Sequence, residues 1–152
     1  MTLAVPKLLA ISSGGGHWVQ LLRLRPAFVG CRVLYATVAN EYRSDVVGEQ
    51  FQMIPDANRW RKFALLRSAV AVLIVILRFN PDVVVTTGAA PGYLGALIGK
   101  MLGSRVIWVD SAANVEKISL SGRLAALFVD LCLTQWQHLE RPNGPLYYGS
   151  VI

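Results

Sequence analysis

Residues 81–88, Pro-Asp-Val-Val-Val-Thr-Thr-Gly, form the stretch that decides the fold. Its valines follow one another without polar alternation, which is typical of a strand buried on both faces. Pro81 stops the segment before it, and Gly88 ends the strand, so we predict a strand over residues 82–86. A strand buried on both faces needs helices on each side, which indicates a parallel sheet in an α/β domain.

Similar apolar runs recur on either side of this stretch and alternate with longer, helix-like segments. The alternation is the signature of repeated βαβ units. We therefore expect one domain, residues 1–152, with a Rossmann-like, doubly wound and mostly parallel sheet. The predicted strands are 8–11, 32–38, 50–54, 82–86, 105–109, 131–134 and 146–148, and the predicted helices are 17–24, 59–79, 91–102 and 121–128.

Length and composition narrow the class of protein further. A chain of 152 residues suits one domain and leaves no room for a second. With 54% hydrophobic and 16% charged residues and a mean hydropathy of +0.46, the chain is not of the disordered class. It is more apolar than an ordinary soluble domain, which indicates that part of its surface meets something apolar.

The net charge of +6 is confined to the first half of the chain. Residues 1–80 carry ten Lys/Arg and four Asp/Glu, whereas residues 81–152 carry five of each. A local basic patch favours a polyanionic partner: nucleic acid, an anionic membrane surface or a phosphorylated substrate. No motif of a nucleic-acid-binding fold accompanies the charge, so we expect no nucleic acid.

The basic residues gather in the predicted helix 59–79, which has five of them and no acid. Residues 69–77 are apolar on every side, so the helix must be covered by the sheet on one face and by lipid or a partner on the other. We expect an interfacial membrane patch, and the alternative is a wholly buried core helix. The patch residues are Arg59, Trp60, Arg61, Lys62, Phe63, Arg67 and Arg78, of which Arg59, Arg67 and Arg78 fall within about a 100° arc of a helix.

The cysteines and the hydropathy of the chain bear on where in the cell the protein lies. Cys31 and Cys132 lie in apolar runs without metal-ligand spacing, so both are expected to be buried thiols in a reducing compartment. No stretch approaches the roughly 20 apolar residues that span a bilayer. We expect a protein that is cytosolic or lies on a membrane.

Ligands of doubly wound sheets bind beyond the carboxyl ends of the strands, near the point where the strand order reverses. This rule selects the loops 12–17, 86–91 and 110–116. The first contains Ser13, Gly14, Gly15 and Gly16 and opens a helix, so its backbone N–H groups can approach an anionic ligand. It matches neither GxGxxG nor a Walker A loop, which argues against dinucleotides and NTPase activity.

His17, Thr87 and Asp110 are the sharpest side-chain candidates in these loops. The imidazole of His17 is suited to act as general base on a hydroxyl, and its alternative is a polar residue of the first helical turn. Asp110 either orients that imidazole or caps its own loop. Thr87 and Gly88 offer a hydroxyl and a close approach to a ligand, or simply a tight turn. Weaker binding candidates in the third loop are Ser111, Asn114 and Glu116, and His138 is expected at the surface.

The chain resembles a known family, the acceptor-side, membrane-associated subunits of split UDP-N-acetylglucosamine transferases of dolichol-linked oligosaccharide synthesis, and more closely their bacterial exopolysaccharide counterparts. The resemblance covers nearly the whole chain. It is carried by Ser13-Gly14-Gly15-Gly16-His17, by residues 81–88, and by Trp108-Val109-Asp110-Ser111, residues 115–123, Gln135-Trp136 and Tyr148-Gly149.

The resemblance implies the N-terminal half of a GT-B glycosyltransferase whose donor-binding domain is a separate chain. It implies an inverting transfer from a UDP-sugar, bound mainly by that partner, to a polyprenyl-pyrophosphate-linked saccharide, with no cofactor and no metal. Eukaryotic members have an N-terminal membrane anchor, which this sequence lacks, so anchoring is expected of residues 59–78. They also have Glu in place of Asp110. The alternatives are a non-catalytic membrane anchor for a competent transferase and a nucleotide-binding domain with an unrelated task.

Overall fold

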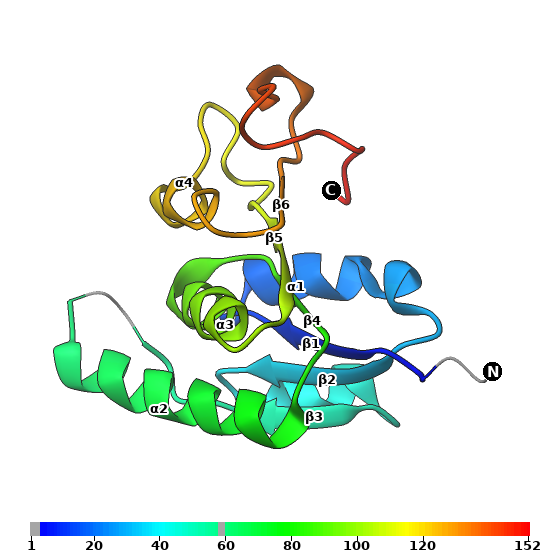
Figure 1. The fold of residues 1–152 in the computed structure, drawn as a ribbon, viewed down its shortest axis with the longest axis vertical. Coiled ribbons are helices and arrows are strands. Elements are labelled where there is room, and N and C mark those ends of the chain that lie inside the picture. Colours follow the sequence, from blue (N-terminus) through cyan, green and yellow to red (C-terminus); the bar gives the residue numbers. More distant parts are fainter. Residues whose placement is uncertain (1–3, 58–59) are drawn as a thin grey trace.

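The computed structural model describes residues 4–57 and 60–152 and contains one six-stranded sheet in the order β3-β2-β1-β4-β5-β6, with every pairing parallel (Figure 1). This confirms the predicted fold class. The strands are β1 (Lys7–Ile11), β2 (Arg32–Thr37), β3 (Gln50–Met53), β4 (Val83–Thr86), β5 (Arg105–Val109) and β6 (Leu131–Leu133). The helices are α1 (Gly16–Arg23), α2 (Lys62–Phe79), α3 (Ala89–Met101) and α4 (Leu120–Ala125), with 3-10 turns η1 (Arg25–Phe28), η2 (Asn40–Val46) and η3 (Gln137–Leu139).

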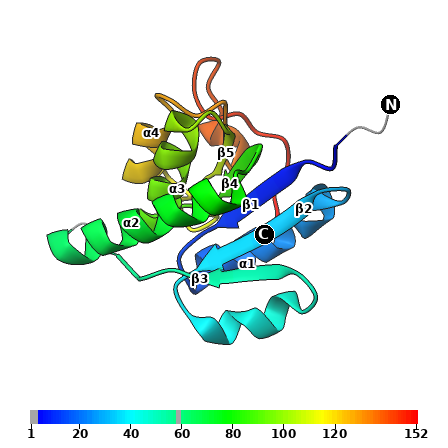
Figure 2. The ribbon, with the colours of Figure 1, turned by 60° about the horizontal axis from the view of Figure 1, so that its bottom comes forward.

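Each face of the sheet is covered, as the unbroken apolar strands require. Leu8 and Ala10 of β1 point to the face packed by α1, where Trp18 is fully buried. Leu9 and Ile11 point to the opposite face, where they pack with side chains of α2, α3 and α4. Figure 2 shows α1 and α2 on opposite sides of β1 and β2.

Helix α3 lies very close to the sheet because glycines line its inner face. A Cβ atom at Gly95 would lie 2.7 Å from Ile11 Cγ2, and one at Gly99 would lie 2.7 Å from Val84 Cγ2. A Cβ at Gly92 would overlap the hydroxyl of Thr86. This close packing fixes the start of α3 against the ends of β1 and β4.

Helix α2 is covered on one side only. Ser68, Val72, Val75, Ile76 and Phe79 are buried against the sheet. The other side is open: Phe63 is 90%, Leu66 62% and Leu77 60% exposed, and Val70, Leu73 and Ile74 are also exposed. The wholly buried helix is therefore wrong, and the expected second, uncovered face is confirmed. In the described part of the chain no helix combines the length and apolarity that a membrane crossing needs.

Several predicted boundaries differ from the observed ones. Helix α2 begins at Lys62 rather than at 59, because Arg61 has an extended backbone with φ −110° and ψ 91°. Helix α4 begins at Leu120 and ends at Ala125, shorter than the predicted 121–128. The predicted strand 146–148 is wrong, since only Leu146 forms a bridge, to Leu133. Cys132 is buried as expected, whereas Cys31 precedes β2 and is half-exposed.

Candidate functional site

The three loops selected from the sequence follow β1, β4 and β5, which are neighbours in the sheet. Beyond β1 the strand order reverses, with β2 and β3 on one side and β4 to β6 on the other. The loops therefore lie at the switch point where ligands of such sheets bind. Hydrogen bonds of His17 and Thr87 join the first two loops, and Gln20 of α1 joins the third loop to them.

His17 and Thr87 join the first two loops reciprocally. His17 Nδ1 lies 2.8 Å from the carbonyl oxygen of Thr87, and Thr87 Oγ1 donates to the carbonyl oxygen of His17 at 2.7 Å. A carbonyl oxygen only accepts, so Nδ1 carries the proton and the neutral ring keeps Nε2 as a proton acceptor. The ring is half-buried and lies against Gly88, since a Cβ built there would be 3.5 Å from His17 Cε1.

The first turns of α1 and α3 face this site without a capping side chain. Their N-cap residues are Gly15 and Gly88, with positive φ of 64° and 110°, and neither first turn holds an acidic residue. Uncapped N–H groups and the helix dipole favour an anion at both places. Ala89, next to Gly88, also has a positive φ, 61°. Such strain in a residue with a side chain gathers at functional sites.

The segment η2 braces the glycine loop from the side of β2. Tyr42 Oη accepts a hydrogen bond from the Gly15 N–H at 2.9 Å, and Trp18 Nε1 donates to Asp45 Oδ2 at 2.8 Å. A Cβ at Gly14 would lie 2.8 Å from Tyr42 Oη, so a larger residue there would displace the Tyr42 side chain. Sequence reasoning missed Tyr42, because nothing in its local pattern links it to a loop 27 residues earlier.

Asp110 lies at the same edge of the sheet but does not orient His17. Its carboxylate is 2% exposed and accepts four hydrogen bonds. The donors are Ser119 Oγ at 2.6 Å, the Ser119 N–H at 3.0 Å, Asn114 Nδ2 at 2.9 Å and Trp108 Nε1 at 3.1 Å. In the described residues no hydrogen bond joins it to His17, so the orienting role is wrong and the loop-capping alternative fits.

Gln20 ties the third loop to α1, one turn after His17. Its Nε2 donates to the Asp110 carbonyl oxygen at 3.0 Å, and its Oε1 accepts from the Ala112 N–H at 2.9 Å. A hollow of about 290 Å³ opens beside this contact, with Gly16 and Ser111 in its wall. Gln20, like Tyr42, was not among the sequence candidates.

The remaining predicted binding residues differ in how exposed they are to solvent. Gly14 and Ser13 are half-buried, Gly16 is exposed, and Thr87 and Gly88 are buried. Ser111 Oγ accepts from the Ala113 N–H at 3.2 Å and Asn114 supports Asp110, so both shape the third loop. Glu116 is exposed on that loop, and His138 is at the surface as expected.

Burial and the nearby Asp110 carboxylate raise the pKa of the Cys132 thiol to about 12, which makes it an inert core residue. No group of His, Cys, Asp and Glu within residues 4–57 and 60–152 has the arrangement of a metal site. The features of the site that can take part in chemistry are the half-buried imidazole of His17 and the uncapped N-termini of α1 and α3.

The described basic and aromatic residues of the predicted membrane patch lie just before α2 and along it. Trp60, Arg61, Lys62, Phe63, Arg67 and Arg78 are all exposed. Arg59 lies outside the described residues. Of the expected arc of arginines, the structure describes Arg67 and Arg78, and both lie in α2.

The comparisons with solved structures define the class of fold. MurG of Acinetobacter baumannii superposes with a TM-score of 0.73 at 13% identity, over 93% of this chain and 44% of that one. UDP-N-acetylglucosamine 2-epimerase of Rickettsia bellii gives a TM-score of 0.72 at 13% identity, over 97% and 45%. The chain spans less than half of each of these proteins and has the fold of one Rossmann-like half of a GT-B glycosyltransferase.

The family follows from the sequence comparisons. Residues 55–151 match the family described as "Oligosaccharide biosynthesis protein Alg14 like", and the chain belongs to this family. Proteins named UDP-N-acetylglucosamine transferase subunit ALG14 are similar to it. The one from Yarrowia lipolytica is 26% identical over 97% of this chain and 82% of its own length. The one from Schizosaccharomyces pombe is 36% identical over 47% and 37%, and the human one 29% over 59% and 45%.

Proposed function

We propose that this chain is the acceptor-binding, membrane-associating subunit of a two-component glycosyltransferase. The complex would transfer a sugar from a UDP-sugar to a polyprenyl-pyrophosphate-linked saccharide, in exopolysaccharide or capsule synthesis. Family membership and the names of the relatives support a transferase subunit. A donor-binding chain would supply the other Rossmann-like half and bind most of the UDP-sugar.

The observation that carries the catalytic part of this proposal is the His17–Thr87 contact. The Thr87 carbonyl oxygen fixes the proton on Nδ1, so Nε2 of His17 is available as a base. In the proposed step, Nε2 takes the proton of the acceptor hydroxyl while the hydroxyl oxygen attacks the anomeric carbon of the donor. The bond from that carbon to the UDP oxygen breaks, the configuration inverts, and UDP leaves.

The uncapped N-termini of α1 and α3 would hold a diphosphate in this arrangement. Their N–H groups and dipoles stabilise negative charge without a cation, so the proposal requires neither a metal nor a cofactor. Gly88 and Ser111 would line the acceptor's path, and the buried Thr87 would hold His17 in place. Asp110 would keep the third loop in shape without touching the reacting atoms.

The exposed face of α2 supports the membrane part of the proposal. Its apolar side chains are uncovered, and five basic residues accompany them in residues 59–78 without an acid. Such a surface binds the headgroup region of an anionic bilayer. The subunit would be a peripheral protein on the cytoplasmic face of the plasma membrane, where UDP-sugars are present.

The same surface favours a second candidate function, a non-catalytic anchor that only recruits a competent transferase. Co-expression with the chain encoded in the adjacent reading frame tests both. The assay follows transfer of labelled N-acetylglucosamine from UDP-N-acetylglucosamine to a polyprenyl-pyrophosphate-linked N-acetylglucosamine in vesicles. We expect transfer only when both chains are present.

Three results would contradict the proposal, and two of them would favour another function. Equal transfer by the second chain alone excludes an acceptor-binding role. Full activity of the His17→Ala complex, with the complex intact, leaves only the anchor. Saturable binding of the UDP-sugar by this chain alone favours a nucleotide-binding domain instead.

A further inference from the structure

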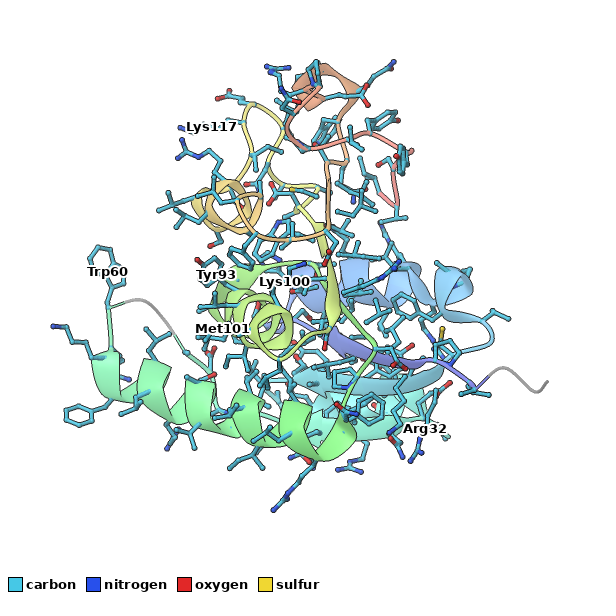
Figure 3. The ribbon with its side chains drawn as sticks, in the orientation of Figure 1. Arg32, Trp60, Tyr93, Lys100, Met101 and Lys117 are labelled. Atoms are coloured by element: carbon cyan, nitrogen blue, oxygen red, sulfur yellow. The ribbon has the colours of Figure 1, made fainter. Side chains whose placement is uncertain are left out.

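A groove of about 570 Å³ opens between α2, α3 and α4. Its walls come from the start of α2, the start of α3 and from α4. Figure 3 shows Trp60 and Tyr93 on the side of the molecule where these helices meet. The volume lies within the roughly 300–1,000 Å³ of sites that hold small molecules. The lining residues are Ala57, Trp60, Leu65, Ala89, Ala90, Tyr93, Leu94, Leu120, Ser121 and Leu124.

Among the residues that the structure describes, none with a charged side chain lines this groove. The lining is aliphatic and aromatic apart from Ser121 and the hydroxyl of Tyr93. The ring of Tyr93 is held in place by edge contacts with Trp108 and Phe128, with centroids 6.4 and 5.9 Å away. A preformed wall of this kind favours a hydrocarbon over a phosphate, a sugar or a charged peptide.

One end of the groove is formed by residues that directly follow a neighbour of the candidate base in the chain. Ala89 and Ala90 line it, and they follow Gly88, the residue that lies against the His17 ring. A single ligand with a polar head and an apolar tail can therefore have its head at His17 and its tail in the groove. The uncapped N-terminus of α3 lies between the two, where a diphosphate would be placed.

We infer that the groove binds the first isoprene units of the acceptor lipid. This inference rests on the proposed function and adds to it: the chain would recognise the lipid tail itself, in addition to associating with the membrane. The tail would leave the groove past Trp60, close to the exposed start of α2. Bilayer lipid around the α2 face would then hold the rest of the polyprenyl chain.

The test is the dependence of KM on the length of the acceptor tail. The co-expressed complex is assayed with two acceptors that carry the same sugar diphosphate, one on a polyprenyl chain and one on a short, water-soluble alkyl chain. Leu124→Arg places a charge in the groove at a partly exposed position of α4. Leu127→Arg is the matched control, because Leu127 is 83% exposed, lies just after α4 and does not line the groove.

We expect Leu124→Arg to raise KM for the polyprenyl acceptor by about tenfold or more and to leave KM for the short acceptor unchanged. Losing two buried methylene groups accounts for a factor of that size. Leu127→Arg should change neither value. Equal effects on both acceptors, or none, would overturn the inference. Two further outcomes would also overturn it, each with an unchanged ratio of the KM values for the two acceptors. If Leu124→Arg loses the partner chain, the groove binds that protein. If the variant loses vesicle binding, the groove binds bilayer lipid.

A binding measurement separates this inference from the proposed function. Farnesyl diphosphate and inorganic pyrophosphate are titrated into this chain alone, followed by tryptophan fluorescence. The groove predicts tighter binding of the farnesyl compound and loss of that difference in Leu124→Arg, even where the complex transfers no sugar. Equal affinity for both probes contradicts the inference, and absence of transfer with both acceptors contradicts the proposed function.

Discussion

Ser119 holds both oxygens of the Asp110 carboxylate: its hydroxyl donates to Oδ1 at 2.6 Å and its backbone N–H donates to Oδ2 at 3.0 Å. The same hydroxyl oxygen accepts from the Gly122 N–H at 2.9 Å and so caps α4. One serine therefore joins the end of β5 to the start of α4. Gly122 allows this approach, since a Cβ there would lie 2.6 Å from Asp110 Oδ1.

Asp110→Asn is expected to destabilise the fold by about 3 kcal/mol, because an amide N–H₂ group would face donors in a buried site. Ser119→Ala should cost about 1–2 kcal/mol through loss of the cap and one hydrogen bond. Urea unfolding followed by circular dichroism measures both. An Asp110→Asn protein as stable as the wild type would show that the carboxylate is not the structural centre of the loop.

Ala89→Gly is expected to raise stability by about 0.5–1 kcal/mol. Relief of a left-handed conformation at φ 61° outweighs the greater freedom that glycine has in the unfolded chain. Gly95→Ala, in the same helix, should instead lose about 1–3 kcal/mol by forcing α3 away from Ile11. Thermal unfolding distinguishes the two directions, and a loss of stability in Ala89→Gly would contradict strain at that residue.

The elements of the fold could largely be predicted from sequence, and the contacts of the site could not. The valines of β4 and the apolar run 105–109 predict buried strands because their burial needs no knowledge of distant residues. The partners of Asp110 depend on Ser119, nine residues later, and the support of the glycine loop depends on Tyr42. The first contact depends on the path of the chain between β5 and α4, and the second on the packing of η2 beside the glycine loop. The apolar composition of residues 146–148 predicts a strand, but it does not reveal that only Leu146 forms a bridge with β6, at Leu133.

Arg61→Glu/Lys62→Glu is expected to weaken binding to vesicles of phosphatidylcholine and phosphatidylglycerol by about tenfold or more at low salt. Each basic residue near an anionic surface contributes about 1 kcal/mol, and the change reverses two charges. Co-sedimentation across a salt series measures the effect. Arg105→Glu, an exposed position at the start of β5 and outside the patch, is the control. Unchanged sedimentation of the double variant would remove the membrane role of this end of α2.

The two cysteines should react at very different rates with a thiol reagent at pH 8. With a pKa raised to about 12 by burial, roughly one Cys132 thiol in ten thousand is ionised there, whereas Cys31 is half-exposed. Ellman's reagent is expected to modify one thiol quickly and the second only on unfolding. Cys31→Ser should remove the fast phase, and a fast phase that survives this change would contradict the burial of Cys132.

The measurement that tests the central claim most directly is kcat of the reconstituted complex with His17→Gln. Glutamine retains a hydrogen bond to the Thr87 carbonyl oxygen and cannot accept the proton of the acceptor hydroxyl. Removal of a general base lowers a rate by about 10²–10⁴-fold. We expect kcat to fall by about that factor, with the partner still bound and stability within about 1 kcal/mol of the wild type. A kcat within about twofold of the wild type would show that His17 is not the base and that this subunit only recruits its partner to the membrane.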